Sequence, residues 1–162
     1  MAFNKIKIEG NNKTNAMHLH CFHELNKMHV RNELPLKFIH PEQTVILSSS
    51  QGLSSRKGKF DFLVETLKGK LIGFEVLTRP SKGKMKEKLA YANEVDEFVF
   101  VLPHDAMQFY QKPKTKVFHK KCRLNYFGNE FSSSSLKVWL FNLRDGRFTE
   151  KASFNKVFCV KK

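Results

Sequence analysis

The stretch KFDFLVETLKGKLIGFEVL, residues 59–77, decides the fold. It consists of two apolar runs of strand length, and the connecting segment contains Gly69, a residue suited to the left-handed position of a tight turn. Each run carries one carboxylate, Asp61 or Glu75, that its apolar pattern does not require. If the turn is a three-residue loop, the numbers of paired residues sum to 136. Asp61 then lies directly opposite Glu75.

The register of this hairpin determines what the two acids can do. Carboxylates held side by side repel each other unless a cation lies between them, so the 136 register predicts a metal site. With a two-residue loop the paired numbers sum to 137, and the acids point to opposite faces of the sheet. A polar edge hairpin with solvated acids is a further alternative.

The composition is that of a folded protein without membrane segments. The chain has 162 residues, of which 41% are hydrophobic, enough for one domain with a substantial core. No apolar run approaches the roughly 20 residues of a membrane helix, and residues 1–5 lack a signal-peptide core. We therefore expect an intracellular protein. The three cysteines are far apart and form no CxxC pair, which indicates reduced thiols.

Net charge is the strongest global signal. Lysine and arginine number 29 against 15 acids, which gives a charge of +14. Residues 111–162 alone hold 13 basic side chains and three acids. Such a field attracts polyanions, so it predicts a nucleic-acid partner, and we expect DNA. Solubility, or an acidic protein partner, is the alternative explanation of the charge.

The remaining pattern predicts an α/β fold. An apolar stripe with helical period marks a helix over residues 13–29, and a second stripe marks one over 83–96. Residues 38–40 and 44–47 are short extended runs, and 97–102 is an apolar strand. Further strands are expected at 136–143 and 148–158, around the turn signal Asp145-Gly146.

A strand–helix–strand step from 75 to 97 favours a right-handed parallel crossover. The fold class is therefore α/β, with a mixed central sheet, a carboxylate-bearing β-hairpin, flanking helices and a basic C-terminal β extension. The chain is expected to be a single domain, 1–162, with a core at 13–103 and the extension at 111–162.

This order of elements, with Asp61 and Glu75 on a central hairpin, resembles the PD-(D/E)XK nuclease superfamily, in particular the small archaeal Holliday-junction resolvases and related restriction-type cores. The resemblance implies that Asp61 and Glu75 bind Mg²⁺ or Mn²⁺, with the Val76 carbonyl as a possible additional ligand. By position, Glu24 matches the further acid that an N-terminal helix often supplies in that family.

The sequence departs from the family pattern at Leu77, which stands where the motif has its lysine. The chemistry needs a cation there to orient water and to stabilise charge on the phosphoryl oxygens. In the 136 register Lys59 pairs with Leu77, so its ammonium group is one substitute. Other candidates lie near the start of the next helix, namely Arg79, Lys82 and Lys84. Loss of catalysis in a retained DNA-binding fold is the alternative.

The sequence thus predicts a metal-dependent endonuclease that hydrolyses DNA phosphodiester bonds. Its alternatives are a non-catalytic DNA-binding protein of the same fold, and a basic accessory protein that binds RNA or a nucleoprotein complex. A homodimer is compatible with either activity. The residues expected to contact the nucleic acid are Arg56, Lys57, Arg79, Lys86, Lys120, Lys121 and Arg123.

An aromatic segment and a histidine-rich segment are two further motifs in the chain. The aromatic rings of Tyr126, Phe127 and Phe131 lie among basic residues and are candidates for stacking on unpaired bases. The histidine-rich segment 18–24 does not predict a zinc-protease site, because Lys27 stands where the second histidine of that motif belongs.

Overall fold

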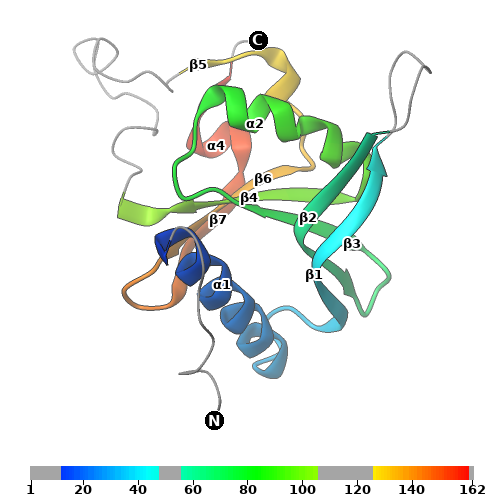
Figure 1. The fold of residues 1–162 in the computed structure, drawn as a ribbon, viewed down its shortest axis with the longest axis vertical. Helices are drawn as coiled ribbons and strands as arrows, with labels where there is room; N and C mark the ends of the chain where they lie inside the picture. Colours follow the sequence, from blue (N-terminus) through cyan, green and yellow to red (C-terminus); the bar gives the residue numbers. More distant parts are fainter. Residues whose placement is uncertain (1–11, 48–55, 106–125, 161–162) are drawn as a thin grey trace.

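A six-stranded mixed sheet forms the centre of the molecule (Figure 1). The computed structural model describes residues 12–47, 56–105 and 126–160. The strand order is β1-β2-β3-β4-β6-β7. The bounds are β1 Leu36–Leu47, β2 Arg56–Thr66, β3 Leu71–Val76, β4 Glu97–Pro103, β6 Leu136–Asn142 and β7 Arg147–Ser153. Strands β3, β4 and β6 are mutually parallel, and the other neighbours pair antiparallel. The expected α/β class with a mixed sheet is confirmed.

Helices cover both faces of this sheet. Helix α1, Asn12–Val30, lies on one face. Helix α2, Lys82–Lys88, and the short helix α4, Phe154–Val157, lie on the other (Figure 1). A 3₁₀ helix, η2 Leu89–Glu94, follows α2. Two short elements, η4 Asn129–Phe131 and the pair β5 Tyr126–Phe127 with β8 Cys159–Val160, complete the described chain. No helix among the described residues is long and apolar enough to cross a membrane.

Each face of the sheet has its own core cluster. The α1 stripe of Met17, Cys21, Leu25 and Met28 is buried against side chains of β2, β3, β4 and β6, as its spacing predicts. On the opposite face, Met85 of α2 and Tyr91 of η2 pack with a set of phenylalanines from β2, β4, η4 and α4. Burial of apolar side chains on both faces fixes the helices to the sheet.

Several boundaries differ from those that the sequence predicts. The helix expected at 83–96 is α for one short stretch, capped by the Ser81 side chain accepting from the Lys84 N–H, and 3₁₀ thereafter. The extended runs on either side of Pro41 form one continuous strand, β1, with Glu42 at a φ of 54°. The return strand expected to reach Phe158 ends at Ser153, where α4 begins.

The C-terminal third completes the central sheet instead of extending it. Strand β6 pairs parallel with β4, and β7 pairs antiparallel with β6 at the outer edge. Three parallel strands buried on both faces require apolar side chains at successive positions, and β4 has six consecutive buried residues after Glu97. The part of the chain expected to be an appendage therefore supplies two of the six strands.

Candidate metal-dependent active site

The β2–β3 hairpin has the register that opposes the two acids. Phe62 pairs with Phe74, and the following pairs, through Glu65 with Leu71, also sum to 136. Gly69 occupies the left-handed region with a φ of 85°, as the turn requires. Of the two registers that the sequence allows, the structure has the 136 register. The same register, continued by one residue, brings Asp61 and Glu75 together at the end of the paired segment.

Asp61 immediately precedes the part of β2 that pairs with β3. The residues of β2 before Phe62 pair with β1 alone. The Val76 N–H donates to the Asp61 Oδ2 at 2.7 Å. The carboxylate thus replaces a backbone acceptor for the last residue of β3. His18 of α1 reaches the same oxygen, with Nε2 at 3.2 Å. Asp61 is therefore held from the β3 side by a backbone donor and from the α1 side by an imidazole.

Glu75 is buried next to Asp61. Its residue is 6% exposed, and its Oε1 lies 3.2 Å from the Nζ of Lys88. Its other oxygen, Oε2, is buried and has no hydrogen-bond partner among the described residues. A buried carboxylate oxygen without a partner is costly, because it has lost its hydration without gaining a donor. This oxygen therefore has the capacity to accept one further donor or a cation.

The electrostatics of the pair favour a bound cation. Burial first, and the charge of Asp61 second, raise the pKa of Glu75 to about 7, although Lys88 and His18 oppose the shift. Burial on its own lowers the pKa of Lys88, but the charge of Glu75 and its hydrogen bond outweigh burial, and the pKa of Lys88 is raised. The lysine is therefore held in its charged form beside Glu75.

Lys88 is the cation that the structure brings to the acids, and it comes from a part of the chain that sequence reasoning did not select. It lies in the last turn of α2, and its Nζ also sits 5.0 Å from the centre of the Tyr91 ring. Leu77, at the motif position of the lysine, is buried in the core beneath α2. One signal was present in the sequence: Lys88 follows the buried Met85 by three residues, so it shares the inward side of the helix.

The cations selected from the sequence lie elsewhere. Lys59 has an exposed side chain on β2. The Nζ of Lys84 donates to the Arg79 carbonyl, and the Nζ of Lys82 lies 5.7 Å from the centre of the Phe127 ring. Among the described residues, Lys88 is the basic residue that forms an ion pair with Glu75.

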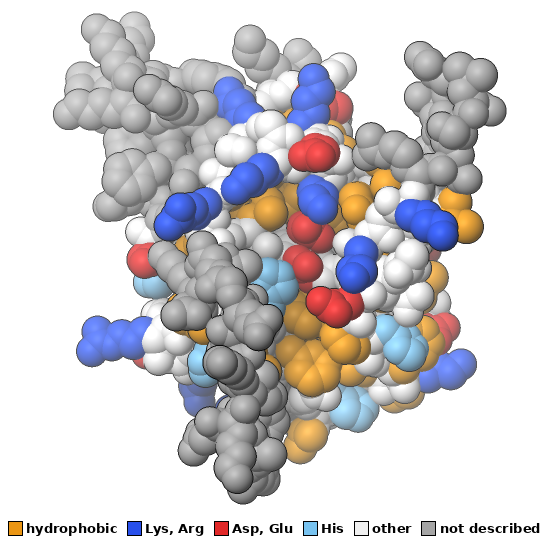
Figure 2. Space-filling view, in the orientation of Figure 1, with side chains coloured by type: hydrophobic (Ala, Val, Ile, Leu, Met, Phe, Trp, Pro, Cys, Tyr) orange, Lys and Arg blue, Asp and Glu red, His pale blue; other side chains and the backbone are white. Residues whose placement is uncertain are grey.

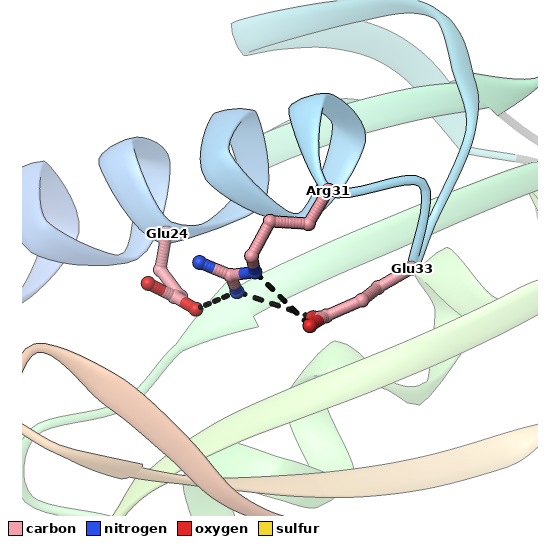
Figure 3. A network of polar contacts seen from close by, with 3 residues as sticks. All are labelled: Glu24, Arg31 and Glu33. Carbon is pink, nitrogen blue, oxygen red and sulfur yellow. Dashed lines mark hydrogen bonds and ion pairs between the residues drawn. The ribbon is translucent and has the colours of Figure 1, made fainter.

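Glu24 belongs to a different cluster. Its buried carboxylate pairs with Arg31, whose guanidinium also donates to Glu33 (Figure 3). This network lines a cavity of about 290 Å³ together with Arg147 and Lys151 of β7. The α1 residue beside Asp61 is instead His18, six residues earlier. No group of three or more histidine, cysteine, aspartate or glutamate side chains with metal-site geometry occurs in the described part of the chain.

Figure 2 shows a face of the molecule on which a small cluster of acidic side chains lies among several basic ones. Lys57, Arg79 and Lys86 are exposed, as nucleic-acid contacts require. The Arg56 side chain lies outside the described part of the structure, as do Lys120, Lys121 and Arg123.

The aromatic rings considered for base stacking are largely unsuited to it. Phe127 and Phe131 are each 2% exposed and pack on each other and on Phe154. The Tyr126 side chain is outside the described part of the chain. Of the cysteines, Cys21 is a buried free thiol, and burial raises its pKa. Cys122 and the side chain of Cys159 also lie outside the described residues.

Comparison with known proteins adds no family to this geometry. The chain matches no protein-family model, and no curated protein matches it significantly.

Proposed function

We propose that this chain is a Mg²⁺- or Mn²⁺-dependent nuclease that hydrolyses phosphodiester bonds of DNA, with a site of the PD-(D/E)XK type whose lysine is supplied by helix α2. The observation that carries the proposal is the position of Lys88. Its Nζ lies 3.2 Å from Glu75 Oε1, and Glu75 in turn lies beside Asp61 on the adjoining strand. Two carboxylates and one ammonium group at a strand end are the minimal set for this reaction.

The residues present fit a divalent cation. Asp61 and Glu75 offer oxygen donors, the type that Mg²⁺ and Mn²⁺ prefer. The unpartnered Oε2 of Glu75 is the second reason, because a cation beside it would relieve the cost of burying that oxygen. The His18 Nε2 lies 3.2 Å from Asp61 Oδ2, where it orients the carboxylate. The Val76 carbonyl remains a candidate ligand, because Val76 follows Glu75 in β3 and its N–H donates to Asp61.

When bound, a divalent cation would neutralise charge at the phosphate and make an attacking water more acidic. The other parts of the mechanism belong to side chains of this chain. Lys88, kept protonated by Glu75, is placed to donate to a phosphoryl oxygen or to orient the water for in-line attack. The Val76 N–H and His18 fix the orientation of the Asp61 carboxylate, so its oxygens are aimed before substrate arrives.

A nucleic acid is the class of substrate that the charge favours. The chain carries +14, and two exposed cations, Arg79 and Lys86, lie in the segment of chain between β3 and Lys88. A polyanion is attracted to such a surface, and its phosphates must approach the acids for hydrolysis to occur.

The test is cleavage of labelled single-stranded, duplex and four-way-junction DNA with Mg²⁺ or Mn²⁺, with an RNA of the same sequence as comparison. The variants are Asp61→Ala, Glu75→Ala and Lys88→Ala, and the control is Lys156→Ala, which removes an exposed lysine of α4. We expect metal-dependent cutting by the wild type and by Lys156→Ala, and severe loss in the other three. Tight, salt-sensitive binding with no cutting under any metal would refute the nuclease proposal and favour a DNA-binding protein.

A further inference from the structure

The part of the β1–β2 ribbon beyond β3 has the features of a nucleic-acid-binding arm. We define the arm as residues 43–47 of β1 with residues 56–60 of β2. Gln43 pairs with Phe60 and Leu47 with Arg56, so the two strands stay joined over the whole arm. The pairing between β2 and β3, in contrast, begins only at Phe62. The arm thus projects from the sheet as a two-stranded ribbon, toward the upper right of Figure 1.

The charge of the arm is of one sign. Its ten residues contain three cations, Arg56, Lys57 and Lys59, and no acid. The side chains of Lys57 and Lys59 are exposed, and neither forms a hydrogen bond or ion pair with another side chain of the described residues. Several lysines elsewhere are paired, as Lys37 is with Glu65 and Lys70 with Glu97. Unpaired cations in a row without an acid suit an external anion.

The arm packs on the core of the α2 layer through the buried side chains of Leu47 and Phe60, and Tyr91 makes its closest contacts with β2. The Tyr91 hydroxyl accepts the Lys59 N–H at 3.1 Å, and a Cβ on Gly58 would come within 2.6 Å of that hydroxyl. Phe60 packs edge-on against the Tyr91 ring, with centroids 5.3 Å apart. Because Gly58 and Phe60 face Tyr91, the alternation of the strand turns Lys57 and Lys59 to the other side, into solvent.

The lysines lead along β2 to the catalytic acid, at the point where the strand turns from burying Phe60 on the α2 side to burying Phe62 on the α1 side. Lys57, Lys59 and Asp61 occupy every second position of β2, about 6.6 Å apart. That interval is close to the distance between successive phosphates of an extended single strand. Asp61 is the point at which this row reaches the site, where Val76 and His18 hold its carboxylate. A strand laid along the arm therefore leads its backbone to the acids.

We propose that the arm binds the phosphodiester backbone of a single-stranded segment of DNA, with Lys57 and Lys59 contacting the two phosphates next to the one at the acids. This inference rests on the proposed function for its substrate. It goes beyond that function in two respects. It assigns the arm as the surface along which the DNA backbone approaches the acids, and it favours DNA that is single-stranded at the arm. Lys59 is then a binding residue and does not contact the reacting atoms.

Salt-dependent binding without metal provides the test. We would measure the affinity of the full chain for a fluorescent 20-nucleotide single strand in EDTA, at a series of NaCl concentrations. The arm variant is Lys57→Gln with Lys59→Gln, and the control is Lys68→Gln with Lys156→Gln. Both pairs remove two exposed lysines, but Lys68 is in the β2–β3 turn and Lys156 is on α4. Circular dichroism establishes that both variants are folded.

Loss of two phosphate contacts should make the slope of log affinity against log salt shallower by about 1.4 in the arm variant. The control should keep nearly the wild-type slope. With Mg²⁺ present, the arm variant should show a raised KM and an unchanged kcat. Equal changes in both variants, or a larger loss on duplex than on single strand, would overturn the proposal. Binding is measured without metal, so a failure of the arm can be told apart from a failure of the nuclease chemistry.

Discussion

Lys88 of α2 and Glu75 of β3 form a half-buried ion pair, with Nζ and Oε1 separated by 3.2 Å. The pair joins the helical layer to the sheet at the end of β3, where Asp61 also lies. The sequence has Leu77 where the motif has its lysine. Lys88, eleven positions later along the chain, brings an ammonium group to Glu75 instead. The predictions below concern this pair, its acids and the elements that hold them.

Replacing Lys88 should remove activity, and a lysine at position 77 should restore part of it. We expect Lys88→Ala to lower kcat by about 10²–10³, the usual cost of losing one electrostatic contact to a transition state. Residue 77 lies on the same strand face as Glu75 by the period of two. Leu77→Lys in the Lys88→Ala background should therefore raise kcat again. Steady-state cleavage of labelled DNA measures both effects.

If the double variant is folded but Leu77→Lys does not raise kcat, Lys88 does not perform the role of the motif lysine. Thermal unfolding shows whether the buried substitution is tolerated, because Leu77 is 9% exposed and packs in the core.

Glu75 should make the protein less stable as the pH rises. Its folded-state pKa is about 7 and its ordinary value is 4.5, so the folded protein binds a proton that the unfolded chain releases. The free energy of unfolding therefore falls between pH 4.5 and pH 7 on account of this group. Glu75→Gln removes the effect. Relative to wild type, we expect its stability to improve by on the order of 2–3 kcal/mol between pH 5 and pH 8.

Urea unfolding of both proteins at pH 5 and pH 8 measures that difference. Glu97→Gln is a suitable control, because Glu97 also pairs with a lysine but is more exposed. A pH dependence that is the same in all three proteins would contradict the raised pKa of Glu75.

Divalent cations should stabilise the folded chain through the acid pair. Ligands that bind only the folded state raise its stability in proportion to the logarithm of their concentration. We expect Mg²⁺ or Mn²⁺ to raise the Tm of the wild type but not that of Asp61→Asn or Glu75→Gln. The shift should be larger at pH 8 than at pH 6, because protons compete for Glu75 near pH 7. Differential scanning fluorimetry gives the readout without DNA.

Glu24 offers a matched comparison for this experiment. Its carboxylate is buried with Arg31, away from Asp61 (Figure 3). Glu24→Gln should therefore keep the metal-induced rise in Tm. A loss of that rise equal to the loss in Asp61→Asn would place Glu24 among the metal ligands after all.

Two glycines should respond to alanine in opposite ways. A Cβ at Gly58 would lie 2.6 Å from the Tyr91 hydroxyl, whereas none of the surrounding atoms lies within 4 Å of a Cβ at Gly83. Gly58→Ala should cost about 1–3 kcal/mol through overpacking. Gly83→Ala, within α2, should stabilise by about 0.5–1 kcal/mol. Urea unfolding distinguishes them, and similar changes in both would mean that Tyr91 moves away freely.

Much of the fold follows from local patterns in the sequence. Gly69 and the apolar runs beside it specify a hairpin with glycine at a positive φ, whereas the folded chain decides between the 136 and 137 registers that the sequence allows. The stripe on α1 specifies which side of the helix meets the sheet. The consecutive apolar residues of β4 specify a strand buried on both faces. These features depend on residues that are neighbours in the chain.

The order of strands and the identity of the active-site cation were decided only by the tertiary structure. Nothing local shows that β6 inserts next to β4, because pairing between distant strands depends on how the whole sheet is covered. Likewise, Lys88 and His18 reach the acids because α2 and α1 pack on opposite faces at particular rotations. Periodicity determines the side of a helix that is buried. The packing of side chains between layers determines which polar residue at its margin meets a given carboxylate.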